Sequence, residues 1–392
     1  MAQFCSHNRR HATIPLGEYL SGLLDRSRKT PDLKFSALAN VSQLGSFDEV
    51  IDVRSPAEFA HDHVPGAINL PVLNDEERAR VGILYKQSSS FDAKKAGAAL
   101  VARNIAQHLE TELYTRTKSW RPLVYCWRGG NRSASMGHIL RQIGWDACVL
   151  DGGYKSYRRH VIAELETLPQ RLQLRVVCGP TGSGKSRSLC AIIDADGQAL
   201  DLEGLAAHRG SVLGNLPDHP QPTQKLFESK VWETLRKFDP VQPVFIEAES
   251  KKIGKLRVPE ALIQRMWSSP CILIDAPMSA RVNFLKQEYV HFLSDQSNLE
   301  VKLRCLQRLH GAEIVDRWVA MARQHKWDML VEELLRNHYD PAYRRSTLKH
   351  YPTLAEAEIY DLQNISADSL SRIAQQILGH ESCGSMPLVD AS

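Results

Sequence analysis

The chain contains an eight-residue loop, Gly179-Pro180-Thr181-Gly182-Ser183-Gly184-Lys185-Ser186, between an apolar run and a helical pattern. The run, Leu174 to Cys178, predicts a buried strand, and the helical pattern continues through Ala191. The loop fits G-x-x-x-x-G-K-[ST] at every fixed position, in the strand-to-helix context that this motif requires. Its glycines let backbone N–H groups turn inward around an anion, and the helix N-terminus adds partial positive charge. We therefore predict a phosphate-binding loop (P-loop) with diphosphate-binding residues Gly179, Gly182, Ser183, Gly184, Lys185 and Ser186.

A P-loop that hydrolyses nucleotides normally pairs with an acid at the end of another strand. Two apolar runs, Val241 to Ile246 and Cys271 to Ile274, predict such strands, and they are followed by Glu247, Glu249 and Asp275. The sequence does not choose among these acids, and it assigns no metal ligand. ATP is the default ligand of such a loop, but any diphosphate ester would fit the same cradle. The ligand and the need for magnesium therefore stay open.

The composition is typical of a soluble globular protein with more than one domain. The chain has 392 residues, of which 43% are hydrophobic and 24% charged, and its net charge is +4. This mildly basic charge permits a nucleic-acid partner without indicating one. Eight cysteines are scattered without paired metal-type spacing, which favours free thiols in a reducing compartment. No window approaches 18 consecutive apolar residues, so we expect a cytoplasmic protein with no membrane partner.

A second loop carries a thiol. The buried-strand pattern Pro122 to Tyr125 leads into Cys126-Trp127-Arg128-Gly129-Gly130-Asn131-Arg132-Ser133, and a helical pattern runs from Ser133 to Ile143. Loop amides, the helix dipole and two arginines would favour the thiolate and hold an anion against it. We therefore predict that Cys126 is a nucleophile, with an anion cradle formed by Arg128, Gly129, Gly130 and Arg132. Persulfide-forming sulfurtransferases and cysteine phosphatases with C-x5-R both use this device.

Neighbouring segments favour the first class. Asp52-Val53-Arg54-Ser55-Pro56-Ala57-Glu58-Phe59 and His63-Val64-Pro65-Gly66-Ala67-Ile68-Asn69-Leu70 resemble the two N-terminal signatures of rhodanese domains. Asp151-Gly152-Gly153-Tyr154 resembles the turn that closes such a domain, and Tyr125 stands where a phosphatase would more often have histidine. The resemblance covers about residues 35–160.

These patterns define the expected organisation. We expect an α/β protein with an N-terminal rhodanese-like domain at 35–160 and a P-loop NTPase-like domain at 173–380, whose C-terminal region is mostly helical. A polar extension at 1–34, a helical linker at 161–172 and a flexible tail at 381–392 complete the chain.

The pairing of the two loops resembles the bacterial tRNA 2-selenouridine synthases over about residues 45–345. Further similar segments include Asp201 to Ser211, Gln221-Pro222-Thr223-Gln224, Ile246-Glu247-Ala248-Glu249-Ser250 and His338-Tyr339-Asp340-Pro341-Ala342-Tyr343. The resemblance implies a transferase that replaces sulfur by selenium in 2-thiouridine at the wobble position of tRNA, with selenophosphate as the donor. It also implies S-geranylated 2-thiouridine, made from geranyl diphosphate, as the intermediate.

The resemblance also implies residue roles. Cys126 would carry selenium as S-selanylcysteine, and Lys185, Ser186 and the amides of Gly182 to Gly184 would hold the diphosphate of geranyl diphosphate. The expected partners are tRNA, selenophosphate and an enzyme that produces selenophosphate; no tightly bound cofactor is expected. His208 and Arg209 are candidates for supporting the P-loop, because their loop has no evident packing role.

Contacts with tRNA are poorly defined by the sequence. Two basic clusters, around Lys251 and around Arg344, are candidates, with Tyr343 and Tyr351 available to stack on a splayed base. Two other functions stay open. One is a rhodanese-type sulfurtransferase whose P-loop domain is an ATP-dependent kinase or activating domain for a small molecule. The other is a non-catalytic adaptor in which both loops sense anions.

Overall fold

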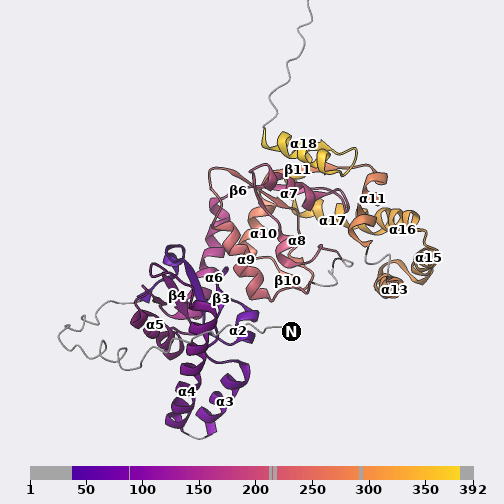
Figure 1. Ribbon diagram of the computed structural model, residues 1–392. Helices are drawn as coiled ribbons and strands as arrows, with labels where there is room; N and C mark the ends of the chain where they lie inside the picture. The colour runs from indigo at the N-terminus through magenta and orange to yellow at the C-terminus, as the bar shows by residue number, and fades with distance from the viewer. Residues whose placement is uncertain (1–37, 88, 212–213, 215–218, 291–294, 380–392) are drawn as a thin grey trace, which may run out of the picture. The chain divides into compact units, whose positions relative to one another are not determined.

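The computed structural model describes residues 38–87, 89–211, 214, 219–290 and 295–379 (Figure 1). The expected polar extension at 1–34 and the tail at 381–392 lie outside these residues, as do Cys5 and Cys383. Both loops lie in one compact unit, which begins at Ala39.

The first sheet has the strand order β1-β5-β4-β2-β3, and its β2–β3, β2–β4 and β4–β5 pairs are parallel. Its central strand β4 is buried at all four positions, which explains its uninterrupted apolar sequence. Cys126 follows β4 directly, at the carboxyl end of the sheet. The strands are β1 (Leu38–Ala39), β2 (Glu49–Asp52), β3 (Ile68–Asn69), β4 (Pro122–Tyr125) and β5 (Cys148–Leu150).

Helices accompany this sheet, and local signals explain several of their ends. Ser55 and Glu58 form a capping box at the start of α2, with Pro56 in the first turn. Helix α5 ends at Gly144, which has a φ of 111°. Helices α3 and α4 pack against each other and were not predicted. The helices are η1 (Val41–Ser46), α2 (Pro56–His61), α3 (Asp75–Gln87), α4 (Ser90–His108), η2 (Leu109–Leu113), α5 (Asn131–Ile143) and α6 (Gly153–Arg171).

Helix α6 joins the two halves of the unit. The expected linker at 161–172 is the second half of this continuous helix, up to Arg171. Tyr157, Val161 and Leu165 are buried along one side of α6, which contacts α9 and α10. The spacing of these residues follows the helical period, so one stripe of α6 packs while the opposite side meets solvent.

The second sheet has the order β12-β11-β6-β8-β7, with every neighbouring pair parallel. Strand β6 is central and leads into the P-loop, so the loop lies at the carboxyl end of the sheet, where ligands bind in open α/β sheets. The strands are β6 (Gln173–Cys178), β7 (Gln198–Leu200), β8 (Pro243–Glu247), β11 (Cys271–Asp275) and β12 (Glu358–Asp361); β9 (Lys252–Ile253) and β10 (Leu256–Arg257) form a separate antiparallel pair.

The region after β11 is mostly helical, as expected, but it also supplies the edge strand β12. Helices α13, α15 and α16 surround a separate core around the fully buried Trp318. The helices of this half are α7 (Lys185–Asp194), α8 (Leu202–Ala206), α9 (Gln224–Leu235), α10 (Glu260–Trp267), α11 (Met278–Glu288), α13 (Gln296–Arg304), α14 (Gln307–His310), α15 (Ala312–Arg323), α16 (Trp327–Leu334), η3 (Leu335–Tyr339), α17 (Asp340–His350), η4 (Pro352–Glu356) and α18 (Ala367–Leu378).

Candidate functional site

The P-loop lies between β6 and α7, as predicted. Gly182 and Gly184 have φ values of 80° and 85°, in the left-handed region that favours glycine. A Cβ on Gly182 would also lie 2.9 Å from the Leu285 side chain, so a larger residue would clash. Lys185 Nζ donates to the Gly179 carbonyl at 2.7 Å, which folds the lysine back over the loop. The glycines therefore give the loop the curvature of an anion cradle.

A pocket of about 500 Å³ opens beside the P-loop. Of the six predicted diphosphate-binding residues, Gly182, Gly184, Lys185 and Ser186 line it, whereas Gly179 and the fully buried Ser183 do not. The same pocket is lined by Glu203, Arg209 and Glu249 among others. The fold thus brings the loop together with one of the predicted acids and with the predicted arginine.

The structure separates the acids that the sequence left equivalent. Glu249 lines the pocket, whereas Glu247 is fully buried and its Oε1 accepts a hydrogen bond from the backbone N–H of Glu203 at 2.8 Å. Asp275 is exposed at the end of β11 and does not line the pocket. Glu203, which sequence reasoning missed, accepts a hydrogen bond from the Ser186 hydroxyl at 3.1 Å.

Burial dominates the electrostatics of these acids. Desolvation raises the pKa of Glu203, Glu247 and Glu249, and their mutual repulsion adds to the rise for Glu247 and Glu249. The pKa of Glu249 reaches about 8, although the nearby Lys185 opposes the rise. At neutral pH the cluster therefore retains protons that exposed carboxylates would have lost.

Two arginines converge on one carboxylate at this pocket. Arg187 Nη2 lies 2.6 Å from Glu288 Oε1, and Arg209 Nη1 lies 2.7 Å from Glu288 Oε2. The Arg209 guanidinium also lies over the Tyr289 ring, 5.0 Å from its centre. His208, by contrast, is only 5% exposed and does not line the pocket.

The segment 338–343 fastens the P-loop from the C-terminal side. Arg281 forms a bidentate ion pair with Asp340, at 3.0 and 2.5 Å, and donates to the Thr181 carbonyl at 2.9 Å. The backbone N–H of Gly179 donates to the Tyr343 hydroxyl at 2.6 Å. The sequence marked this segment only by resemblance, because no local pattern shows that residues so far along the chain support the loop.

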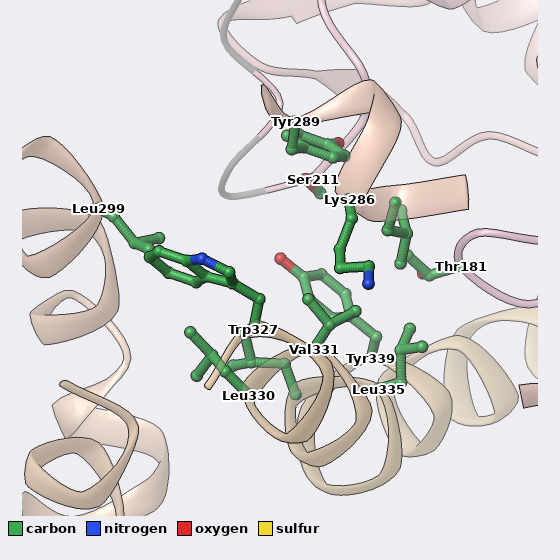
Figure 2. Close-up of a pocket in the computed structure, with 12 residues that line it drawn as sticks. Thr181, Ser211, Lys286, Tyr289, Leu299, Trp327, Leu330, Val331, Leu335 and Tyr339 are labelled. Atoms are coloured by element: carbon green, nitrogen blue, oxygen red, sulfur yellow. The ribbon is translucent and has the colours of Figure 1, made fainter. Parts of the chain in front are cut away.

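An apolar pocket adjoins the polar one (Figure 2). Its volume is about 80 Å³, and side chains from α11, α16 and η3 point toward a common space, among them Tyr289, Trp327, Val331 and Tyr339. The two pockets share part of their lining: Thr181, Ser211, Leu285, Tyr289 and Tyr339. From the sequence this region was expected to be mostly helical, and no pocket was assigned to it.

The cysteine loop lies between β4 and α5. Cys126 is 4% exposed, and its Sγ lies 3.2 Å from the Ser133 hydroxyl oxygen. Burial raises the pKa of the Cys126 thiol, but the Ser133 side chain, backbone amides of the loop and the charge of Arg132 outweigh it, so that the pKa lies below the ordinary value. The loop thus favours the thiolate.

The predicted cradle residues differ in their surroundings. Arg132 pairs with Glu58 at 3.1 Å, and Glu58 also pairs with Arg78 at 2.8 Å, so Arg132 is held beside the loop by an acid. Arg128 and Gly130 are exposed, and Gly129 is half-buried. Of the other thiols, Cys178 and Cys271 are buried in strands, as packing residues would be.

One expectation about a ligand contact is not met. Tyr351 is 4% exposed and its hydroxyl donates to the Glu249 carbonyl, so it is packed rather than available to stack on a base. No group of three or more His, Cys, Asp or Glu side chains among the described residues is arranged to hold a metal ion. No helix in the described ranges is long and apolar enough to span a membrane.

Comparison with known proteins identifies both halves. Residues 36–160 match the rhodanese-like domain family, and residues 172–311 match the family described as the tRNA 2-selenouridine synthase AAA domain. The first match decides between the two classes that share the cysteine loop, in favour of the rhodanese type.

Similar proteins carry the same family name. The chain is 39% identical over 245 residues to a tRNA 2-selenouridine synthase of Nitrosomonas europaea (62% of this chain, 63% of the relative) and 41% identical over 247 residues to one of Alcanivorax borkumensis (62% and 66%). It is 36% identical over 271 residues to one of Bdellovibrio bacteriovorus (66% and 69%). The matches thus span about two thirds of the relatives' lengths. With both domains matched in the expected order, the chain belongs to the tRNA 2-selenouridine synthase family.

Proposed function

We propose that the protein is a tRNA-modifying transferase with two activities. It transfers a geranyl group from geranyl diphosphate to the sulfur of 2-thiouridine at the wobble position, and it then replaces that sulfur by selenium from selenophosphate. The name of the relatives supports action on tRNA. The observation that carries the geranyl step is the continuity of the P-loop pocket with the apolar pocket through their shared lining.

A prenyl diphosphate has the same two-part chemistry. Its diphosphate suits backbone amides at a helix N-terminus with Lys185 beside them. Its hydrocarbon chain suits a space lined by Leu285, Trp327 and Val331, since each buried CH₂ group contributes about 0.8 kcal/mol. The base and ribose of ATP carry several hydrogen-bonding groups, which a mostly apolar lining satisfies less well than it satisfies a hydrocarbon chain.

The two loops then divide the work. The P-loop holds the diphosphate, which departs as the sulfur attacks the first carbon of the geranyl chain. Alkylation makes the sulfur a better leaving group and C2 of the base more electrophilic. Cys126, with its stabilised thiolate, is the residue assigned to carry selenium.

Mass spectrometry of nucleosides tests both activities. The purified protein is incubated with an RNA stem-loop carrying 2-thiouridine, geranyl diphosphate and selenophosphate, and each component is omitted in turn. We expect S-geranyl-2-thiouridine without selenophosphate and its conversion to 2-selenouridine with it. An unchanged nucleoside under every condition, from a protein that binds ATP, would favour the small-molecule sulfurtransferase instead.

A substitution in the apolar pocket tests the geranyl site. Val331→Trp fills part of the space and is expected to raise the KM for geranyl diphosphate by about 10-fold or more, because the chain loses several buried methylene contacts. The affinity for inorganic diphosphate, which has no hydrocarbon chain, should stay within about 2-fold of the wild-type value. Met329→Trp is the matched control, because Met329 is 54% exposed on the same helix. Equal effects of the two substitutions would contradict the assignment.

A further inference from the structure

The geranyl step releases a proton that the P-loop itself does not accept. When the sulfur of 2-thiouridine bonds to the first geranyl carbon, the carbon–oxygen bond to diphosphate breaks and its electrons leave with the diphosphate. The base then reaches the neutral alkylated form by losing the proton on N3. Because N3 is bonded to the carbon that carries the sulfur, the proton acceptor must lie close to the diphosphate cradle.

Two carboxylates meet at that place. The Ser186 hydroxyl, within the P-loop, donates to Glu203 Oε2 at 3.1 Å. A Cβ on Gly210 would lie 2.5 Å from Glu203 Oε1 and 3.0 Å from Glu249 Oε1, so both carboxylates converge beneath this glycine. Both acids line the P-loop pocket, whereas Glu247 is buried behind them.

We infer that Glu249, paired with Glu203, is the general base that takes the N3 proton of 2-thiouridine during S-geranylation. This inference rests on the proposed function. The proton passes from N3 to a carboxylate oxygen of Glu249, and no oxidant or further reactant is needed. After the product leaves, the proton returns to solvent through the pocket.

The backbone around the pair holds it in place. The N–H of Glu203 donates to Glu247, and the Glu249 carbonyl accepts from the Tyr351 hydroxyl at 2.8 Å. The raised pKa of both acids suits a base that works near neutral pH, since proton transfer is most efficient when the pKa of the base lies close to the working pH.

The other titratable groups around Glu203 and Glu249 differ from this pair in charge or position. Cationic side chains in the pocket are Lys185, Arg187 and Arg209, and Glu288 is engaged by both arginines. Burial raises the pKa of the pocket's tyrosines, Tyr289, Tyr339 and Tyr343, and lowers that of His338. Asp201 and Glu247, which adjoin the pair, have raised pKa values because they are buried, but they do not line the pocket.

Glu249→Gln tests the inference because the amide keeps the shape but accepts no proton. Single-turnover geranylation of the 2-thiouridine stem-loop by the full chain is expected to fall about 100-fold, within the usual range for a lost general base. The affinity for geranyl diphosphate should stay within about 3-fold, because the diphosphate and chain contacts remain. Glu260→Gln is the matched control, since Glu260 is exposed on α10 and pairs with Lys251.

A substrate with a more acidic N3–H distinguishes the loss of proton transfer from a structural effect of the substitution. An electron-withdrawing group at C5 of the base should restore at least about 10-fold of the rate in Glu249→Gln, because this proton leaves with less help. In the wild-type chain the rate should rise with pH as the carboxyl pair ionises, and this inflection should vanish in the variant. Glu203→Gln removes a neighbour that raises the pKa of Glu249, so the inflection should move to lower pH instead of vanishing.

The outcomes are distinct. A Glu249→Gln rate within about 3-fold of wild type would overturn the inference, as would an equal loss with both substrates, which indicates a structural role. A wild-type chain that makes no geranylated nucleoside would overturn the proposed function itself, and the inference with it. Thermal unfolding of each variant checks that the chain is folded.

Discussion

The cysteine loop and the P-loop share one local design but differ in what packs around them. Each follows a buried parallel strand, bears glycines and leads into a helix, so each directs backbone amides at an anion. At the cysteine loop the neighbours are Ser133 and the Glu58–Arg132 pair, which favour a thiolate. At the P-loop they are carboxyl groups whose pKa values burial raises, and an apolar pocket.

This difference shows how one backbone device acquires two chemistries. The loop itself supplies only a place for negative charge. In the function proposed above, side chains from elsewhere decide whether that charge is a protein thiolate or the diphosphate of a ligand. Substitutions that affect one loop at a time therefore test whether the two loops carry different steps.

The largest expected effect is that of Cys126→Ala. Selenation should fall below detection, by more than about 100-fold, because no other group replaces the thiolate. Geranylation should stay within about 3-fold of wild type, since the P-loop pocket is unchanged. The measurement is the yield of both nucleosides by mass spectrometry, with Cys305→Ala, an exposed thiol, as the control. Full selenation by Cys126→Ala would refute the role of this cysteine.

Lys185→Ala should produce the opposite pattern at a smaller magnitude. Removal of a charged donor to the diphosphate is expected to slow geranylation by about 10- to 100-fold, corresponding to a charge-assisted hydrogen bond. Selenation of a stem-loop that already carries S-geranyl-2-thiouridine should be retained. The exposed Lys237, changed to alanine, is the control. Equal loss of both steps would show that the loops do not act separately.

The smallest effect concerns the hydrogen bond to the thiol. Ser133→Ala removes a group that lowers the pKa of Cys126, so the pKa should rise and less thiolate should be present at neutral pH. Alkylation of Cys126 by iodoacetamide at pH 7 should slow by about 3- to 10-fold, and the difference should vanish at a pH well above the thiol pKa. Ser135→Ala is the control, because this half-buried hydroxyl on the same helix donates to the Asn131 carbonyl. An unchanged pH profile would contradict the role of Ser133.

The local elements were predictable from the sequence. The strands at 122–125, 174–178 and 271–274 appear within one residue of their expected ends. The first is buried and apolar throughout, as a strand covered on both faces must be, whereas the second contains the exposed Arg175. Both anion loops were equally clear, since every residue of each device is contiguous in the chain. The edge strand β12 was missed because Glu358-Ile359-Tyr360-Asp361 has only two adjacent non-polar residues between acids and is largely exposed.

Sequence by itself thus determined the two loops, the α/β class and Cys126 as the candidate nucleophile. Only the tertiary structure separated Glu249 from Glu247 and Asp275, joined Glu203 to the P-loop and assembled the apolar pocket from α11, α16 and η3. The physical reason is the range of the contacts. A loop between a strand and a helix is encoded by adjacent residues, whereas a pocket depends on side chains that meet only when distant segments pack together.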